Sequence, residues 1–145
     1  MPTRQGAAVA LVLAQFACIA VLLCGSWLLP WWAWAVLATG LLVAALAAGA
    51  LGNRNITAMP LPREGNVLRK RGIYRVVRHP MYMGVLLCGA ALALGAPAWW
   101  RTAAWVLELA VLRVKIDLEE RRLTEKHPEY PELMRGVARL LPGVW

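Results

Sequence analysis

The chain has 145 residues, enough for one domain, and 60% are hydrophobic while 17% are charged; soluble domains are about 45–50% apolar and about 25% charged, so the composition favours a membrane protein. The net charge of +8 fits membrane topology and attraction to anionic lipid, and we expect no nucleic-acid partner. The three cysteines lie in apolar segments without a CxxC pair or Cys/His cluster, which predicts neither a disulfide framework nor a metal site.

The first apolar region is long enough for two membrane-spanning helices. Residues 7–53 contain no charged side chain, and Gln15 is the main polar interruption of the first run. A hydrocarbon core needs about 20 apolar residues per helix, which predicts spans at about 6–29 and 31–51, separated by the helix-breaking Pro30. A cleavable signal peptide fits poorly, because its apolar part is only about 7–15 residues long.

Two more spans are expected in the C-terminal half, at about 80–95 and 98–116. No Gly or Pro interrupts residues 98–127, so the last helix should continue out of the membrane. A cytoplasmic loop at 52–79 precedes these spans, and a cytoplasmic tail at 117–145 follows them. The predicted fold is an all-α integral membrane protein of one domain, residues 1–145, with four transmembrane helices and short C-terminal cytoplasmic helices.

Lysine and arginine residues predict the orientation. They gather in the loop 52–79 and after the fourth span, Arg4 precedes the first span, and only Arg101 falls on the opposite side. Cytoplasmic segments carry an excess of Lys and Arg, so both termini are expected in the cytoplasm, with the protein in the inner membrane if it is bacterial. Tryptophans at the two outer turns agree with an interfacial aromatic belt: Trp27, Trp31, Trp32, Trp34, Trp99, Trp100 and Trp105.

The start of the third span is a candidate anion site. Its first residue is a proline, which suits the first position of a helix, and the free N–H groups of a helix N-terminus favour an anion. Arg78 and His79 add charge or hydrogen bonds there, Tyr82 lies in the first turn, and Gly84 lets a ligand or a neighbouring helix come close. The alternative interpretation is an ordinary basic loop beside the membrane.

Acidic residues at the end of the fourth span form a second candidate site. Glu119 and Glu120 lie at the membrane surface, where they could bind an ammonium, a sulfonium or ribose hydroxyls; the alternative is a solvated helix with salt bridges between successive turns. Glu108 lies inside the span, where a carboxylate is costly and indicates function by default. It could equally be a hydrogen-bonded structural residue.

Several short motifs follow one another in residues 65–145: Gly72-Ile73-Tyr74, Arg78-His79-Pro80-x-Tyr82-x-Gly84, Glu119-Glu120, Glu129-Tyr130 and Arg139-x-x-Pro142. Together they resemble the isoprenylcysteine carboxyl methyltransferase family and the related phospholipid N-methyltransferases. The resemblance implies a membrane-embedded methyltransferase that uses S-adenosylmethionine, with a cofactor pocket between the start of the third span and the C-terminal helices.

The resemblance also implies roles for individual residues. The expected cofactor-binding residues are Arg78, His79, Tyr82, Gly84, Glu119, Glu120 and Tyr130. The expected catalytic residues are Glu120, Arg122 and Arg139, with the two arginines orienting an anionic acceptor.

The expected reaction is S-adenosylmethionine-dependent methyl transfer to a hydrophobic or lipid-like acceptor at the cytoplasmic membrane surface. Carboxyl O-methylation of a prenylated or other lipid-like molecule is preferred, because the neighbouring cations Arg75, Arg122 and Arg139 favour a negatively charged head group. The alternatives are a phospholipid amine N-methyltransferase that acts on membrane lipid, a sterol-reductase-like enzyme that uses NADPH, and a non-enzymatic membrane scaffold. The sequence leaves the oligomeric state open.

Overall fold

A computed structural model describes residues 4–51 and 70–143 of the chain. Its elements are α1 (Arg4–Leu23), α2 (Trp31–Leu51), the 3₁₀ helix η1 (Gly72–Arg75), α3 (Pro80–Gly95), α4 (Trp99–Lys126) and α5 (Tyr130–Leu133). Within these residues all elements are helical, which confirms the all-α prediction, and an isolated parallel bridge joins Val77 to Ala138. Most of the predicted loop at 52–79 lies outside the described residues.

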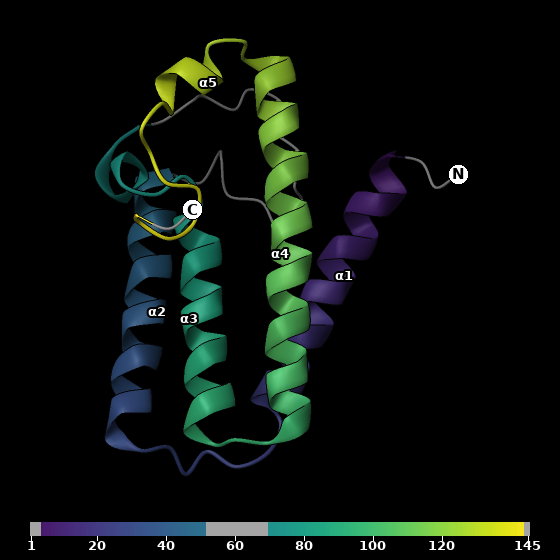
Figure 1. Cartoon of the computed structure of the whole chain (residues 1–145), viewed down its shortest axis with the longest axis vertical. Helices are drawn as coiled ribbons and strands as arrows, with labels where there is room; N and C mark the ends of the chain where they lie inside the picture. Colours follow the sequence, from purple (N-terminus) through teal and green to yellow (C-terminus); the bar gives the residue numbers. More distant parts are fainter. Residues whose placement is uncertain (1–3, 52–69, 144–145) are drawn as a thin grey trace.

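α2, α3 and α4 stand side by side, and α1 leans against α4 (Figure 1). α2 packs chiefly against α3, and α1 packs chiefly against α4. The connections from α1 to α2 and from α3 to α4 lie at one end of the bundle. The beginning of α1, the end of α4 and α5 lie toward the other end. We call that second end the polar end.

The α2–α3 contact depends on small residues. A Cβ atom added to Gly84 would lie 2.7 Å from the carbonyl oxygen of Gly40 and 3.0 Å from the Cβ of Ala44. Small residues let membrane helices approach closely. Of the two roles that the sequence left open for Gly84, the structure therefore supports contact with a neighbouring helix.

The first helix is shorter than predicted. The expected span continued to residue 29, but α1 ends at Leu23, because Gly25 adopts a φ of +93°, a left-handed conformation that ends helices. The Trp27 indole N–H donates to the carbonyl of Leu23 at 3.1 Å and thereby satisfies one exposed carbonyl of the last turn. The other long helices begin within one residue of their predicted starts.

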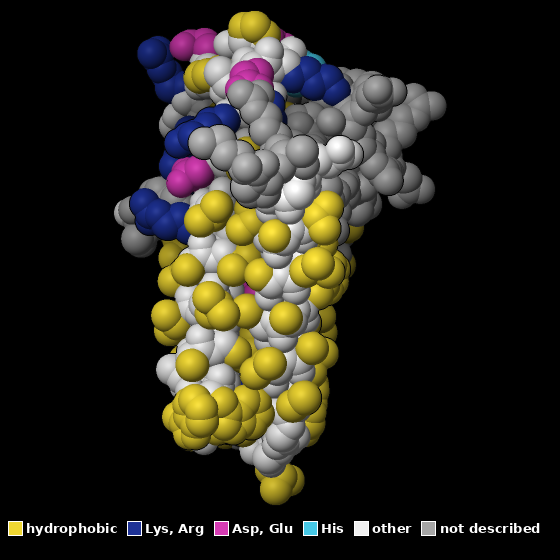
Figure 2. Space-filling model, turned by 90° about the vertical axis from the view of Figure 1, so that its right-hand side faces the viewer, with side chains coloured by type: hydrophobic (Ala, Val, Ile, Leu, Met, Phe, Trp, Pro, Cys, Tyr) yellow, Lys and Arg dark blue, Asp and Glu magenta, His cyan; other side chains and the backbone are white. Residues whose placement is uncertain are grey.

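The surface divides into an apolar column and a charged cap (Figure 2). α1 and α2 are long and apolar enough to cross a membrane, and only 22% and 11% of their spans are buried inside the chain. α3 is a shorter apolar helix. Lipid is the medium that covers apolar helix faces of this extent. These helices therefore indicate a membrane-associated protein, and the surface charges visible in Figure 2 gather at the polar end.

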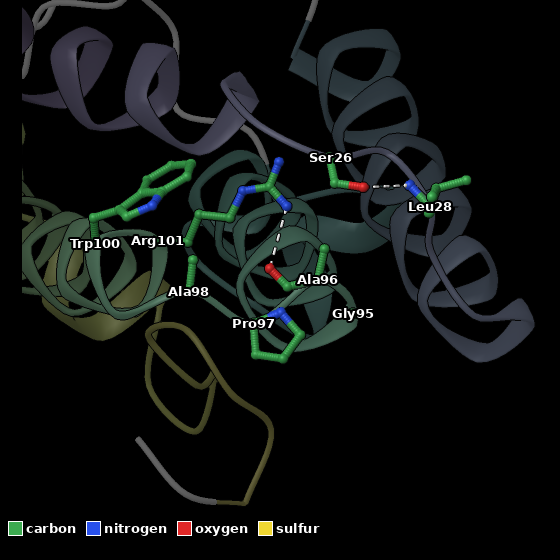
Figure 3. Close-up of a pocket in the computed structure, with 8 residues that line it drawn as sticks. All are labelled: Ser26, Leu28, Gly95, Ala96, Pro97, Ala98, Trp100 and Arg101. Carbon is green, nitrogen blue, oxygen red and sulfur yellow. Dashed lines mark hydrogen bonds between the residues drawn. The ribbon is translucent and has the colours of Figure 1, made fainter.

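Arg101 ties three helices together at the end opposite the polar end. Its side chain is 1% exposed, and it donates to the carbonyls of Cys24 at 2.6 and 3.0 Å, Ala96 at 3.3 Å and Leu92 at 3.4 Å. These carbonyls lie at or just past the C-terminal ends of α1 and α3, where the helix dipole favours a cation. Figure 3 shows Arg101 beside a hollow of about 320 Å³ lined by Ser26, Leu28, Gly95, Ala96, Pro97, Ala98 and Trp100.

We predict that Arg101→Met destabilises the protein by about 2 kcal/mol or more, since a hydrogen bond from a charged donor contributes about 1.5–3 kcal/mol. Thermal unfolding in detergent measures the change. The matched control is Arg135→Met, because Arg135 is 79% exposed and pairs with Glu132 on the surface; an exposed pair contributes about 0–1 kcal/mol. Equal effects of the two substitutions would contradict the role of Arg101.

Candidate functional site

The segment before α3 pairs with the C-terminal tail. Val77 forms the parallel bridge with Ala138, the Arg78 N–H donates to the carbonyl of Ala138 at 2.8 Å, and the His79 N–H donates to that of Arg139 at 3.1 Å. Pro80 then occupies the first turn of α3, where its missing N–H costs nothing. This pairing brings the predicted Arg78-His79 corner beside Arg139, which lies about 60 residues later.

The Arg78 guanidinium anchors the tail further. It donates to the carbonyls of Val137 at 2.9 Å and Met134 at 3.0 Å, and it forms an ion pair with Glu120 at 3.3 Å. Its donors thus serve the tail and α4 at once. Arg78 consequently has a structural role in the described contacts, whatever it adds to ligand binding.

Glu120 is the centre of a charge cluster. Its side chain lies 3.2 Å from His79 Nε2, 2.9 Å from Arg139 Nη2 and 3.3 Å from Arg78 Nη1. Burial raises the pKa of this carboxyl, but the hydrogen bond with His79 and the charges of His79, Arg139 and Arg78 outweigh burial, so its pKa is lowered. Glu120 is therefore an ionised carboxylate whose charge is already balanced by neighbouring residues.

Glu119 is the more accessible of the two acids. The Tyr82 hydroxyl donates to Glu119 Oε2 at 2.9 Å, and His79 Nδ1 lies 3.8 Å from the same oxygen. The side chain of Glu119 is nevertheless 29% exposed, against 10% for Glu120. The His79 and Tyr82 rings stack with centroids 5.7 Å apart. Glu119 is thus a fixed carboxylate that an incoming cationic group can reach.

The two arginines expected to orient an acceptor have carboxylate partners. Arg139 pairs with Asp117 at 3.3 Å as well as with Glu120. Arg122 pairs with Glu125 one turn along α4 at 2.9 Å, and the described contacts do not join it to the Glu120 cluster. The structure therefore brings Arg139 into the candidate site and leaves Arg122 paired with Glu125.

Tyr130 packs under the tail. Its side chain is 4% exposed and lies in an apolar cluster with Met134 and Val137. Burial raises the pKa of its phenol, and the nearby Glu120 carboxylate raises it further. Tyr130 is therefore a neutral phenol that packs against Met134 and Val137 of the tail.

Some of the residues at the site gave little signal in the sequence. Asp117 was one of several charges at the end of α4, and its pairing with Arg139 depends on the position of the tail. The Lys70 ammonium donates to the carbonyl of Leu133 at 2.6 Å, a contact to a backbone atom that a sequence pattern cannot indicate. Within residues 4–51 and 70–143, no group of His, Cys, Asp or Glu side chains is arranged to hold a metal ion.

Comparison with known proteins identifies the family. A family model described as phospholipid methyltransferase matches residues 15–129, which is more than half of the chain. The chain belongs to the phospholipid methyltransferase family. This family covers the isoprenylcysteine carboxyl methyltransferase-like group, so the resemblance found in the sequence is confirmed. No curated protein matches the chain.

Membership in this family indicates a methyltransferase that acts on lipid-like substrates. The matched segment contains the Arg78-His79 corner and both glutamates, whereas Tyr130 and Arg139 lie beyond its end. Membership in this family supports neither the sterol-reductase-like alternative nor the scaffold.

The charges at the site suit S-adenosylmethionine, which carries a carboxylate, an ammonium and a sulfonium. Glu119 is exposed enough to accept from an ammonium or a ribose hydroxyl, and the first turn of α3 presents backbone N–H groups beside His79. The site thus offers a side-chain acceptor for a cation and backbone donors for an anion. The residues present fit this cofactor.

We predict that Glu120→Gln loosens the tail, because it removes the charge shared by Arg78, His79 and Arg139. Limited proteolysis in detergent should cut the tail after α4 sooner than in the unchanged protein. Glu119→Gln, the neighbouring isosteric change, should leave the cutting rate unaltered. Identical cutting rates for all three proteins would contradict the role of Glu120.

The same contact predicts a pH dependence. Because the folded-state pKa of Glu120 lies below its unfolded value, the contact contributes stability above the ordinary carboxyl pKa of about 4.3 and loses it as the pH falls through the folded-state pKa. The thermal midpoint of the unchanged protein should therefore fall more steeply over this acidic range than that of Glu120→Gln.

Proposed function

We propose that this protein transfers the methyl group of S-adenosylmethionine to a lipid-like acceptor at the cytoplasmic surface of the membrane. The observation that carries the proposal is that the Arg78-His79 corner, Glu119, Glu120 and the tail meet in one cluster at the polar end of the apolar helices. A cofactor that is soluble in water can reach this end from the cytosol, while an amphiphilic acceptor reaches it from the membrane.

The chain's part in the reaction is binding and alignment. When bound, S-adenosylmethionine supplies an electrophilic methyl group. We assign its ammonium or ribose hydroxyls to Glu119, and its carboxylate to the first N–H groups of α3. Glu120 and Arg78 hold these groups in place by fixing the tail against α4. Alignment of two reactants contributes up to about 7–11 kcal/mol in favourable cases, which suits a site with few reactive side chains.

The contacts support an amine acceptor better than a carboxylate. The expectation of carboxyl O-methylation relied on Arg75, Arg122 and Arg139 for an anionic head group. Two of these, Arg122 and Arg139, already pair with carboxylates, while Arg75 is exposed. The matched family model is described as phospholipid methyltransferase, which also favours a phospholipid acceptor. We therefore place phospholipid amine N-methylation first and retain carboxyl O-methylation of an isoprenylcysteine-like acceptor as the second candidate, on the strength of the motifs.

The dependence of rate on pH distinguishes the two acceptors. With an amine, the rate of methyl transfer should rise with pH toward an amine pKa near the lysine value of about 10.4, whereas with a carboxylate it should be flat from about pH 6 to 9. The measurement is transfer of radiolabelled methyl into a membrane lipid extract. Base-stable products indicate N-methylation and base-labile products indicate methyl esters; absence of label in any lipid would contradict the proposed function.

We further propose a single domain with four membrane spans, at 4–23, 31–51, 80–95 and 99–116, and with both termini in the cytoplasm. In Figure 1, α2, α3 and α4 lie side by side along one axis, with α3 running in the opposite direction to the other two, and this supports the arrangement. The Lys and Arg residues after α4 support the orientation.

Cysteine accessibility tests this topology. In a variant without the native cysteines, a cysteine placed in the turn at 95–98 should react with an impermeant reagent added outside the cell. A cysteine placed at 70–75 should react only after the membrane is opened. The opposite pattern would contradict the orientation, and labelling of both positions from outside would contradict the number of spans.

A further inference from the structure

A lysine is buried between α1 and α4, directly beneath the candidate site. The side chain of Lys115 is fully buried, and its ammonium donates to the Gln15 side-chain oxygen of α1. The same ammonium lies 5.2 Å from the centroid of the Tyr82 ring. Tyr82 in turn donates its hydroxyl to Glu119. One continuous set of contacts thus leads from α1 to the accessible carboxylate of the site.

Lys115 is also the positive member of a buried row of charges. Its ammonium interacts electrostatically with Glu119 on one side and Glu108 on the other. Glu108 lies about two helical turns earlier on α4, is fully buried, and faces Gln15 and Cys18 of α1. Neither of its carboxylate oxygens has a hydrogen-bond partner among the described residues. Charges in an apolar interior are costly. A row of buried charged residues that ends at the candidate site therefore indicates a functional role.

We propose that Lys115 is a positioning residue, which holds Tyr82 and Glu119 in the orientation that receives the amino group of the cofactor. This inference rests on the proposed function. Glu108 balances the charge of Lys115 on the side away from the site, and Gln15 fixes its ammonium from α1. α1 thereby belongs to the functional unit although it contributes no residue to the Glu120 cluster.

Two ligands that differ in the amino-acid part test this role. S-adenosylhomocysteine carries the amino group, whereas 5′-methylthioadenosine has the same nucleoside without the amino-acid part. Lys115→Met should weaken binding of S-adenosylhomocysteine by about tenfold or more, because a charge-assisted hydrogen bond loses its alignment. Binding of 5′-methylthioadenosine should change by less than about twofold. Isothermal titration in detergent measures both affinities. Lys115→Arg should restore part of the loss. The matched control is Arg121→Met, because Arg121 is an exposed cation of α4.

Combination with Glu119→Gln shows whether Lys115 acts through Glu119. If it does, the double variant should bind S-adenosylhomocysteine no more than about twofold more weakly than Glu119→Gln alone. If Lys115→Met does not fold, Gln15→Leu serves in its place, since it leaves the charge on α4 and removes only the partner on α1. It should show the same selective loss for S-adenosylhomocysteine.

The outcomes separate this inference from the proposed function. Equal losses for both ligands would mean that Lys115 only holds α1 against α4, and additive losses in the double variant would mean that it acts independently of Glu119; either result overturns the inference. Unchanged binding of both ligands in Lys115→Met or Gln15→Leu overturns it too. If the unchanged protein binds neither ligand, the proposed function fails and takes the inference with it.

Discussion

The buried carboxylate of Glu120 joins three parts of the chain that are far apart in the sequence. It belongs to α4, and its partners come from the start of α3 and from the tail. A buried carboxylate without partners would be strongly unfavourable, so these three segments must meet wherever Glu120 is ionised. The parallel bridge between Val77 and Ala138 follows from the same meeting, and so does the burial of Tyr130 beneath the tail.

This constraint explains how a site with many charges lies beside a membrane. On the face that Figure 2 shows, the charged surface side chains gather at one end of the apolar column of helices. There, most described charges are paired, which lowers the cost of keeping them close to lipid. Glu119 is held by Tyr82 and is still partly exposed, so it is suited to meet a ligand.

The different surroundings of Glu119 and Glu120 also affect which acceptor the site favours. Two of the three arginines that were expected to favour an anionic head group, Arg122 and Arg139, are held by acids of α4, whereas Glu119 remains accessible beside Tyr82. A positively charged nucleophile, or the positively charged cofactor, therefore meets a more favourable environment than a second anion. Beneath this site, the row of Gln15, Lys115 and Glu108 extends the polar contacts into the apolar part of α1 and α4.

The sequence alone determined the fold class, the helices and the family. Apolar runs specify membrane helices because lipid leaves no other partner for backbone groups than the helix itself, and the starts of α2, α3 and α4 follow from Pro30, Pro80 and Pro97. The predicted end of α1 was wrong, because the left-handed conformation of Gly25 ends the helix although the apolar run continues past it. The motifs predicted which side chains would matter, but not how they would be paired.

Tertiary structure decided those pairings. Successive residues on a helix point about 100° apart. Glu119 and Glu120 therefore share His79 but differ in their other partners, and the identity of those partners depends on where α3 and the tail lie. The same reason separates Arg139, which the tail carries into the cluster, from Arg122, which faces Glu125. Gln15 appeared in the sequence only as an interruption of an apolar run, because the lysine that it binds is 100 residues away along the chain and becomes its neighbour only when α1 docks on α4.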